Sequence, residues 1–442
     1  MKDNFLFSLV LAFIGLLYAV SVQSEAKTIN DSVNLAVINP LNYGAIGDGV
    51  TDDTIGLQKA FRTCSVRGWQ CRLPKNKSFL VKEPLFLWGK ASLIGEGTDS
   101  EIIFDVNNAP YLLNLGISGR NKLEKPFTGA ISNVDFKIRG GKGGRIIFLW
   151  RTAGAIISNN TFDVGSYAYS ATSSGNDNRW VKNGFKNLVR KNIIIERNTI
   201  TAKVDNIGSE GIGLGHFDGA IIKDNIINGV GDDPIGVHFS KNIRIINNKM
   251  KSVDGRLFVA NSVNVEVVGN EHQRIASLLD NKFYKGISLL YIGFENSVIK
   301  SKLSAPTNIN VYNNYLAYPE GAIDAGAAIY LYGPRNVSVF KNIIVNDSSK
   351  VVATAIHMLP KVFSTKWSDP DNRDGPKLAR VWDVSVHNNI TEGKYPQKII
   401  MTGNCVSYAG EISISANLAS GYQIYCQNIK NKDNIKIKAN DS

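Results

Sequence analysis

The sequence predicts an all-β protein, a single-stranded right-handed parallel β-helix with an N-terminal capping helix. Three observations predict this fold. A unit of alternating apolar residues and asparagine recurs at intervals close to 22 residues. Ahead of it, "NYGAIGDGVTDDTIGLQKAF" (42–61) joins a glycine-rich turn to an amphipathic helix. The 442-residue chain is 43% hydrophobic and 20% charged, which supplies a large core and excludes a disordered protein.

The N-terminal segment, residues 1–26, has the features of a secretory signal peptide. Lys2 precedes an apolar run from Phe5 to Val20, and small residues follow as far as Ala26. The run is shorter than the ~20 apolar residues that a membrane span needs. We therefore expect a secreted protein, extracellular or periplasmic, with no membrane span after cleavage and a β-helix domain over residues 27–442.

Residues 39–67 are expected to form the N-terminal cap. The helix in this segment has one apolar stripe, formed by Leu57, Ala60, Phe61 and Cys64. Asp53 or Thr54 is positioned to cap its first amides. A stack of coils ends in unpaired strand edges and an exposed core, so a helix laid across that end would close it.

The coils are expected over about residues 72–392, with further coils or a C-terminal cap over 393–442. The unit "NIRIINNKM" (242–250) is typical: alternating apolar residues indicate a strand with one buried face, and an asparagine follows. An interval close to 22 residues is long enough for three short strands joined by turns, which make one coil of the β-helix. Coils stack ~4.8 Å apart, so the recurring asparagines should form a hydrogen-bonded ladder with a structural role. A β-sandwich would not repeat this residue at Asn160, Asn198, Asn225, Asn248, Asn270, Asn314, Asn342 and Asn389.

The charge and the cysteines suit an exported protein. The formal net charge of +12 becomes +13 when residues 1–26, with Lys2, Asp3 and Glu25, are removed. An exported basic protein fits an anionic polysaccharide or cell surface better than nucleic acid, although the same charge also serves solubility alone.

The four cysteines allow three connectivities. The near-neighbour disulfides Cys64–Cys71 and Cys405–Cys426 are the simplest.

Residues 39–104 resemble the N-terminal signature of the pectate-lyase-like right-handed parallel β-helix superfamily, and the asparagine repeat extends the resemblance to about residue 392. That superfamily contains polygalacturonases, rhamnogalacturonases, polysaccharide lyases, uronate epimerases and phage tailspikes. The resemblance implies the fold and a polysaccharide partner. It does not fix the reaction.

Two long polar insertions, 163–186 and 360–377, carry Trp180 and Trp367. An indole face suits a sugar ring, so both tryptophans are candidate substrate-binding residues. Equally, these rings could serve only to hold their own loops.

Carboxylates concentrate in residues 205–256. Glu210 lies 23 residues before Asp233, and Asp232 lies 22 before Asp254, the same steps that separate the ladder asparagines of those coils. We therefore expect two stacked carboxylate pairs. Carboxylates ~5 Å apart repel, so one of each pair should keep its proton at neutral pH. Glycoside hydrolysis uses one protonated and one ionised carboxyl group, which makes these four residues catalytic candidates.

The same window resembles the polygalacturonase-type glycoside hydrolases. "GDD" (231–233) and the following "PIGV" match that family's second motif. "GSEG" (208–211) and "VDGR" (253–256) stand where the family has Asn-Thr-Asp-Gly and Gly-His-Gly, and only "QRI" (273–275) stands for its Arg-Ile-Lys. The resemblance implies a hydrolase with an altered site. Turns between strands also favour glycine and aspartate, so a turn-forming role stays open.

A second mechanism is open to the same region. His216 and His238 each occur in "HF", and Arg256 follows nearby. These candidate substrate-binding residues would suit a lyase or uronate epimerase, in which a cation neutralises the uronate and a base abstracts its C5 proton. No cofactor motif is visible. Calcium on Asp232, Asp233 and Asp254 would need further oxygen ligands. A third possibility is a polysaccharide-binding or assembly protein without turnover.

Overall fold

The computed structural model describes residues 36–442, except for 98, 108, 118–124, 141–143, 166–169, 174–189, 204–208, 254, 276–287, 295–304, 323–325, 352–353, 363–377, 380, 396, 405–407, 416, 418, 420–421, 428–434 and 439–442. The chain divides into residues 1–36 and residues 37–442. Only the second unit is described below. The expected signal peptide therefore lies outside the described residues. Within them, no helix is long and apolar enough to cross a membrane.

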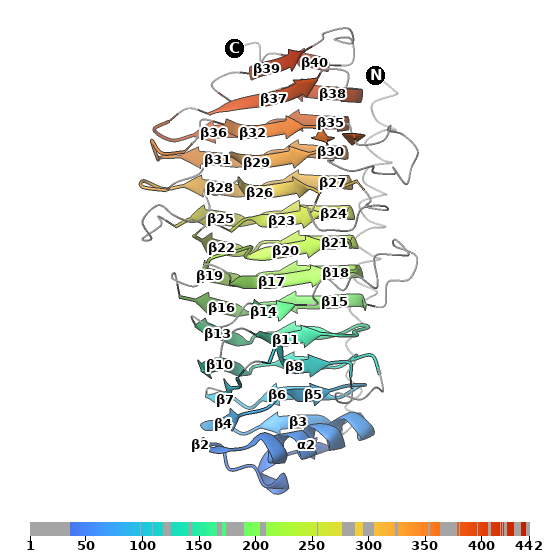
Figure 1. The fold of residues 1–442 in the computed structure, drawn as a ribbon, viewed down its shortest axis with the longest axis vertical. Coiled ribbons are helices and arrows are strands. Elements are labelled where there is room, and N and C mark those ends of the chain that lie inside the picture. The colour runs from blue at the N-terminus through green and yellow to red at the C-terminus, as the bar shows by residue number, and fades with distance from the viewer. Residues whose placement is uncertain are drawn as a thin grey trace, which may run out of the picture. The chain divides into compact units, whose positions relative to one another are not determined.

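Residues 37–442 form a right-handed parallel β-helix, which confirms the predicted fold class (Figure 1). Successive strands enter three parallel sheets in turn, here named A, B and C. Sheet A contains β1 (Val37–Ile38), β3 (Gln70–Leu73), β6 (Ser92–Gly95), β9 (Ala130–Ser132), β12 (Ile156–Ser158), β15 (Arg190–Glu196), β18 (Phe217–Lys223), β21 (Lys241–Ile246), β24 (Val263–Val268), β27 (Thr307–Tyr312), β30 (Arg335–Phe340), β35 (Val381–His387), β38 (Tyr408–Ser415) and β40 (Ile435–Lys438).

Sheets B and C complete each coil. Sheet B contains β2 (Asp48–Asp52), β4 (Lys77–Val81), β7 (Ser100–Asp105), β10 (Asp135–Gly140), β13 (Thr161–Gly165), β16 (Thr199–Ala202), β19 (Ile226–Val230), β22 (Lys249–Ser252), β25 (Glu271–Arg274), β28 (Tyr315–Tyr318), β31 (Ile343–Asn346) and β36 (Ile390–Glu392). Sheet C contains β5 (Leu85–Leu87), β8 (Tyr111–Leu115), β11 (Arg145–Leu149), β14 (Ser170–Ser173), β17 (Glu210–Gly215), β20 (Ile235–His238), β23 (Leu257–Ala260), β26 (Ser288–Gly293), β29 (Ala327–Tyr332), β32 (Thr354–Leu359), β37 (Lys398–Asn404) and β39 (Tyr422–Gln427).

The core lies inside the coils because alternate residues of each strand point inward. In sheet C, Ile212 pairs with Ile235, Ile235 pairs with Leu257, and all three side chains are buried. Apolar side chains therefore stack in columns from one coil to the next. Outside the three sheets, β33 (Lys361–Val362) and β34 (Leu378–Ala379) form a short antiparallel pair.

The N-terminal turn contains η1 (Pro40–Tyr43) and leads through β2 into α2 (Thr54–Arg67). Gly44, Gly47 and Gly49 have φ angles of 89°, 67° and 75°, a left-handed conformation that glycine adopts most easily. This explains the glycines of the motif. As predicted, Leu57, Ala60, Phe61 and Cys64 lie on the buried face of α2, which also includes Thr54, Gly56 and Ser65.

The expectation that Asp53 or Thr54 caps the first amides of α2 is wrong. Asp53 holds the cap position, but its carboxylate accepts hydrogen bonds from the N–H groups of Ile46 (2.5 Å) and Gly47 (3.1 Å) instead. The first amide of the helix donates to Asp52 Oδ1 (3.1 Å). The reason is that the glycine-rich turn brings amides without strand partners to Asp53, and a carboxylate satisfies them better than water does.

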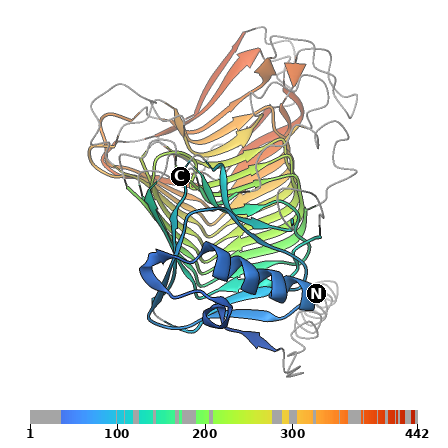
Figure 2. The same ribbon diagram turned by 60° about the horizontal axis from the view of Figure 1, so that its bottom comes forward.

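Side chains of α2 complete the hydrogen bonding of the first coil. Gln58 accepts from the Phe86 N–H (2.9 Å) and donates to the Phe86 carbonyl (3.1 Å), as a neighbouring strand would. Thr54 Oγ1 accepts from the Lys82 N–H and Ser65 Oγ from the Trp88 N–H. Figure 2 shows α2 lying across this end of the sheets. The helix thus covers the core and also pairs an edge strand.

Replacing Gln58 by alanine should destabilise this end of the fold. The change leaves the Phe86 N–H and carbonyl without their partners, and each poorly satisfied backbone group costs about 1–3 kcal/mol, less where water enters. We expect a loss of about 1–2 kcal/mol in the free energy of unfolding, measured by urea denaturation. Lys59→Ala, on the exposed face of the same helix, is the control. An equal effect of both changes would contradict the edge-pairing role.

The first predicted disulfide is present. Cys64, in α2, is bonded to Cys71, in β3, and both residues are fully buried. The bond ties the cap to the first strand of sheet A that follows it. Cys405 lies outside the described residues, so its pairing with Cys426 stays a prediction.

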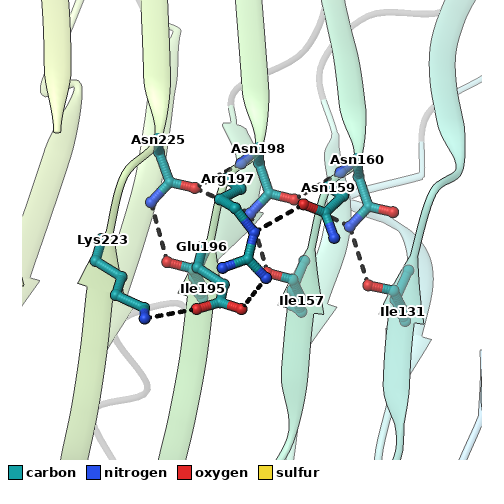
Figure 3. Close-up of polar contacts among 10 residues, drawn as sticks. All are labelled: Ile131, Ile157, Asn159, Asn160, Ile195, Glu196, Arg197, Asn198, Lys223 and Asn225. Carbon is teal, nitrogen blue, oxygen red and sulfur yellow. Dashed lines mark hydrogen bonds and ion pairs between the residues drawn. The ribbon is translucent and has the colours of Figure 1, made fainter.

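The asparagine ladder is present and runs inside the turn between sheets A and B. Each Nδ2 donates to the Oδ1 of the next asparagine and to a main-chain carbonyl, as Asn160, Asn198 and Asn225 show in Figure 3. The same Oδ1 also accepts the previous asparagine's backbone N–H, for example Asn198 N–H to Asn225 at 3.0 Å. Asn417 extends the ladder beyond Asn389 and is the member that the repeat pattern did not reveal.

Candidate functional site

The acidic cluster lies at the turns that lead into sheet C. Asp232 and Asp233 precede β20, and Glu210 begins the neighbouring β17. The pairing of β17 with β20 aligns Glu210 with Asp233, and the Gly211 N–H donates to the Asp233 carbonyl (3.1 Å). The spacing of the repeat therefore predicted this stacking correctly. Asp254 lies outside the described residues.

Glycine allows these turns to pack closely. A Cβ at Gly255 would lie 1.7 Å from the Asp232 carbonyl oxygen, so no other residue fits there. The close approach places the next residue, Arg256, beside Asp233. Its Nε lies 3.5 Å from Asp233 Oδ1, and its backbone N–H lies 3.4 Å from the same oxygen. The glycines of these motifs therefore do form tight turns, as the sequence left open. The same turns also orient the charged side chains of Asp233 and Arg256.

Asp233 is the most strongly perturbed carboxyl group of the cluster. The residue is only 7% exposed. Burial and the negative charges of Asp232 and Glu210 together raise its pKa to about 8, because the positive charges of Arg256 and His238 oppose the shift only in part. Asp233 therefore carries a proton at neutral pH.

Asp232 differs from its neighbour because solvent reaches its side chain. Desolvation still raises its pKa, while Arg256, the Asp233 N–H and His238 lower it. The two adjacent aspartates thus sit in different environments, one enclosed and one open. Such a pair separates into an acid and an ionised base more readily than two equivalent carboxylates do.

The structure separates the two candidate histidines. His238 is half-buried at the end of β20, and its charge acts on both aspartates. His216 is 2% exposed, has a φ of 63° at the corner after β17, and stacks on Phe239 with ring centroids 5.3 Å apart. A substrate can reach His238 far more easily than His216. Trp180 and Trp367 lie outside the described residues.

A row of rings continues from the cluster along the outer face of sheet C. We call Phe258, Tyr291, Tyr330 and His357 the aromatic row, because each pairs with the next across adjacent strands. Successive ring centroids lie 4.9, 5.7 and 5.1 Å apart. The Arg256 guanidinium lies over Phe258 (4.4 Å) and Tyr291 (4.8 Å), which joins the row to the acidic cluster.

Sequence reasoning missed the aromatic row, although a signal for it exists. Gly213, Gly236, Phe258 and Tyr330 each lie twelve residues before a ladder asparagine, so they occupy one outward column of sheet C. Insertions displace Tyr291 and His357 from this count. Beside the aspartates this column contains the glycines Gly213 and Gly236, and from Phe258 onward it contains aromatic rings. The acidic cluster is therefore bordered on one side by aromatic rings.

One further residue that the sequence singled out has a structural role. Arg274, within the "QRI" remnant, is 1% exposed and donates to the carbonyls of Gly255 (2.7 Å) and Ser288 (2.8 Å). It holds the turn below Arg256 and is not available to a substrate.

Among the described residues, no group of three or more acidic, histidine or cysteine side chains is arranged to hold a metal ion. Because Asp254 is not among them, the calcium hypothesis stays untested.

Comparison with solved structures identifies the same fold in other proteins. The surface protein and adhesin PfbA of Streptococcus pneumoniae aligns with a TM-score of 0.57 at 15% identity, covering 88% of this chain and 100% of that one. The A-module of the Azotobacter vinelandii mannuronan C-5 epimerase AlgE4 aligns with a TM-score of 0.50 at 14% identity, covering 91% and 97%.

A GH87 α-1,3-glucanase from Streptomyces thermodiastaticus aligns with a TM-score of 0.50 at 13% identity, covering 88% of this chain and 68% of that chain. No protein-family model and no curated protein sequence matches the chain. Identities this low show a common fold, the right-handed parallel β-helix, and leave the activity to be argued from the site.

Proposed function

We propose that the protein is an exported glycoside hydrolase that cleaves an acidic polysaccharide at the cluster of Glu210, Asp232 and Asp233. The observation that carries the proposal is the buried Asp233, whose pKa is raised to about 8, beside the exposed Asp232 on a face bordered by aromatic rings. Similar folds support a glycan as the partner, since one such protein is named a glucanase and another a mannuronan epimerase.

The proposed chemistry needs no group beyond these side chains and water. Asp233 gives its proton to the glycosidic oxygen as the bond from that oxygen to the anomeric carbon breaks. Asp232, as the ionised partner, removes a proton from the water whose oxygen bonds to the anomeric carbon. The sum is one water consumed and one new reducing end, and the proton on Asp232 returns to Asp233 through solvent. The charge of Glu210 helps to keep Asp233 protonated, and Arg256 provides a cation for a uronate.

The proposal is tested by incubating the mature protein with polygalacturonate, alginate and neutral glucans. A hydrolase releases reducing ends without ultraviolet absorbance. A lyase would instead form an unsaturated, absorbing uronate. An epimerase would release neither product but would change the C5 configuration of the uronate, which NMR of the glycan detects. Neither product and no such change, with binding retained, would favour the third possibility, a binding or assembly protein.

The lyase or epimerase alternative has one specific observation in its favour. His238 and Arg256 face the same cluster, so a base and a cation stand within one site. His216 no longer belongs to this alternative, because it is buried against Phe239. His238→Gln should abolish activity if His238 is the base that takes the C5 proton. It should leave a hydrolase with much of its rate.

Activity should fall as the pH rises through about 8, since Asp233 then loses the proton that it donates. Stability should fall over a lower range, from about pH 4 to about pH 8, and then level off. The folded state holds the proton to about pH 8, whereas the unfolded carboxyl group loses it near 3.8. Between these values the folded state binds more protons, so the free energy of unfolding decreases with rising pH. Rates and urea denaturation from pH 5 to 9 would check this, and a flat profile for both would contradict it.

A further inference from the structure

A second groove crosses the N-terminal end of sheet C, away from the acidic cluster. Two adjoining hollows of about 670 Å³ and about 520 Å³ share Glu83, Pro84 and Phe86 in their walls. The first lies between the outer face of α2 and β5. The second lies over β5 and β8 and reaches Trp150, directly after β11. We call the two hollows together the accessory groove.

Basic side chains dominate the charge of the accessory groove. Lys59 and Arg62 of α2, with Lys82 and Lys125, are exposed along its walls. Among the described lining residues, Glu83 is the one acidic side chain. The groove is therefore positive, and it favours an anionic occupant.

Aromatic rings supply flat surfaces in the same place. Phe86, Tyr111 and Trp150 are half-buried and line the second hollow. Tyr111 is supported from behind by Phe148, with ring centroids 3.7 Å apart, and by the Arg145 guanidinium at 5.8 Å. A pyranose packs one face on such a ring, while its carboxylate can meet a lysine or arginine at the rim.

The accessory groove shares its face with the acidic cluster. The outward column of sheet C runs in register from Phe86 through Asn114 and Phe148, and across β14 to Gly213 and Gly236. β8 and β20 are four strands apart in this sheet, which corresponds to about 19 Å at the usual strand spacing. A polymer, but not a single sugar, could therefore occupy both sites.

We propose that the accessory groove is a separate binding site for an anionic polysaccharide, held by its rings and its basic rim. The inference extends the proposed function but does not require turnover at Asp233. A general polyanion would use the cations alone, and a neutral glycan would use the rings alone. The combination assigns an acidic glycan.

The test measures binding in the Asp233→Asn protein, so that no ligand is degraded. Affinity electrophoresis or calorimetry with polygalacturonate, alginate and hyaluronan gives Kd for each. Reversing the basic rim (Lys59→Glu, Arg62→Glu and Lys82→Glu) should raise Kd for the preferred glycan at least about tenfold, since three attractive contacts become repulsive. The matched control reverses three exposed lysines on or beside sheet B, Lys203, Lys249 and Lys251, and should change Kd less than about twofold.

A second variant separates a glycan site from a charged patch. Trp150→Ala should raise Kd for the glycan about fivefold or more through the lost ring contact, while binding of inorganic polyphosphate stays unchanged. The proposal is overturned if none of the three glycans binds, or if both charge reversals act equally. It is also overturned if polyphosphate or a neutral glucan binds as tightly as the best acidic glycan. Melting temperatures of all variants confirm folding, and loss of turnover alone bears only on the Asp233 site.

Discussion

Replacing Asp233 by asparagine is expected to lower kcat by about two to four orders of magnitude, the usual contribution of a general acid. Asparagine is nearly isosteric and can still accept the Arg256 N–H hydrogen bond. It cannot donate the proton that burial and the neighbouring carboxylates keep on Asp233. Glycan affinity should hold or improve, because one potential negative charge leaves a crowded acidic site.

Stability provides the second measurement on the same variant. Above pH 4 the folded protein must keep Asp233 neutral or tolerate a buried charge, and asparagine removes that requirement. The melting temperature at pH 7 should therefore stay level or rise. Asp224→Asn is the matched control, since Asp224 is exposed with a φ of 56°, a conformation that asparagine accepts. Activity that survives Asp233→Asn and Glu210→Gln together would exclude this cluster from the mechanism.

Replacing Asn248 by alanine is expected to destabilise the fold by about 3–5 kcal/mol, because several buried polar groups lose their partners together. Asn248 is fully buried. Its Nδ2 donates to the carbonyls of Ile222 (3.0 Å) and Ile246 (3.1 Å) and to Asn270 (2.9 Å). Its Oδ1 accepts the backbone and side-chain N–H groups of Asn225. Water cannot replace these bonds without opening the turn.

An exposed ladder supplies the control. Asn264 donates to Asn242 and accepts from Asn308, both at 3.0 Å, on the outer surface of sheet A. Its φ of 56° suits glycine, so Asn264→Gly removes the side-chain bonds without backbone strain. Solvent replaces those bonds, and the loss should be about 1 kcal/mol or less. Urea denaturation of both variants makes the comparison. Similar losses would show that burial does not set the strength of the ladder.

The asparagine ladder also explains why the fold could be predicted well. A buried amide that must meet its equivalent in the next coil fixes the position of one residue per coil. The chain therefore repeats Asn225, Asn248 and Asn270 at nearly constant intervals. Alternation around them marks which residues face the core. The same arithmetic placed Glu210 beside Asp233, since no insertion separates those coils.

What the sequence by itself determined was therefore the interior, namely the coil length, the ladder and the buried face of α2, together with the stacking of Glu210 on Asp233. What only the tertiary structure decided was the outer face. The aromatic row joins Phe258 to His357 across insertions of unequal length, and the accessory groove joins α2 to Trp150. Core positions recur because every coil buries the same columns. Outward positions follow the same period only where no insertion interrupts it, and burial does not fix their residue types, so strand pairing was needed to identify these neighbours.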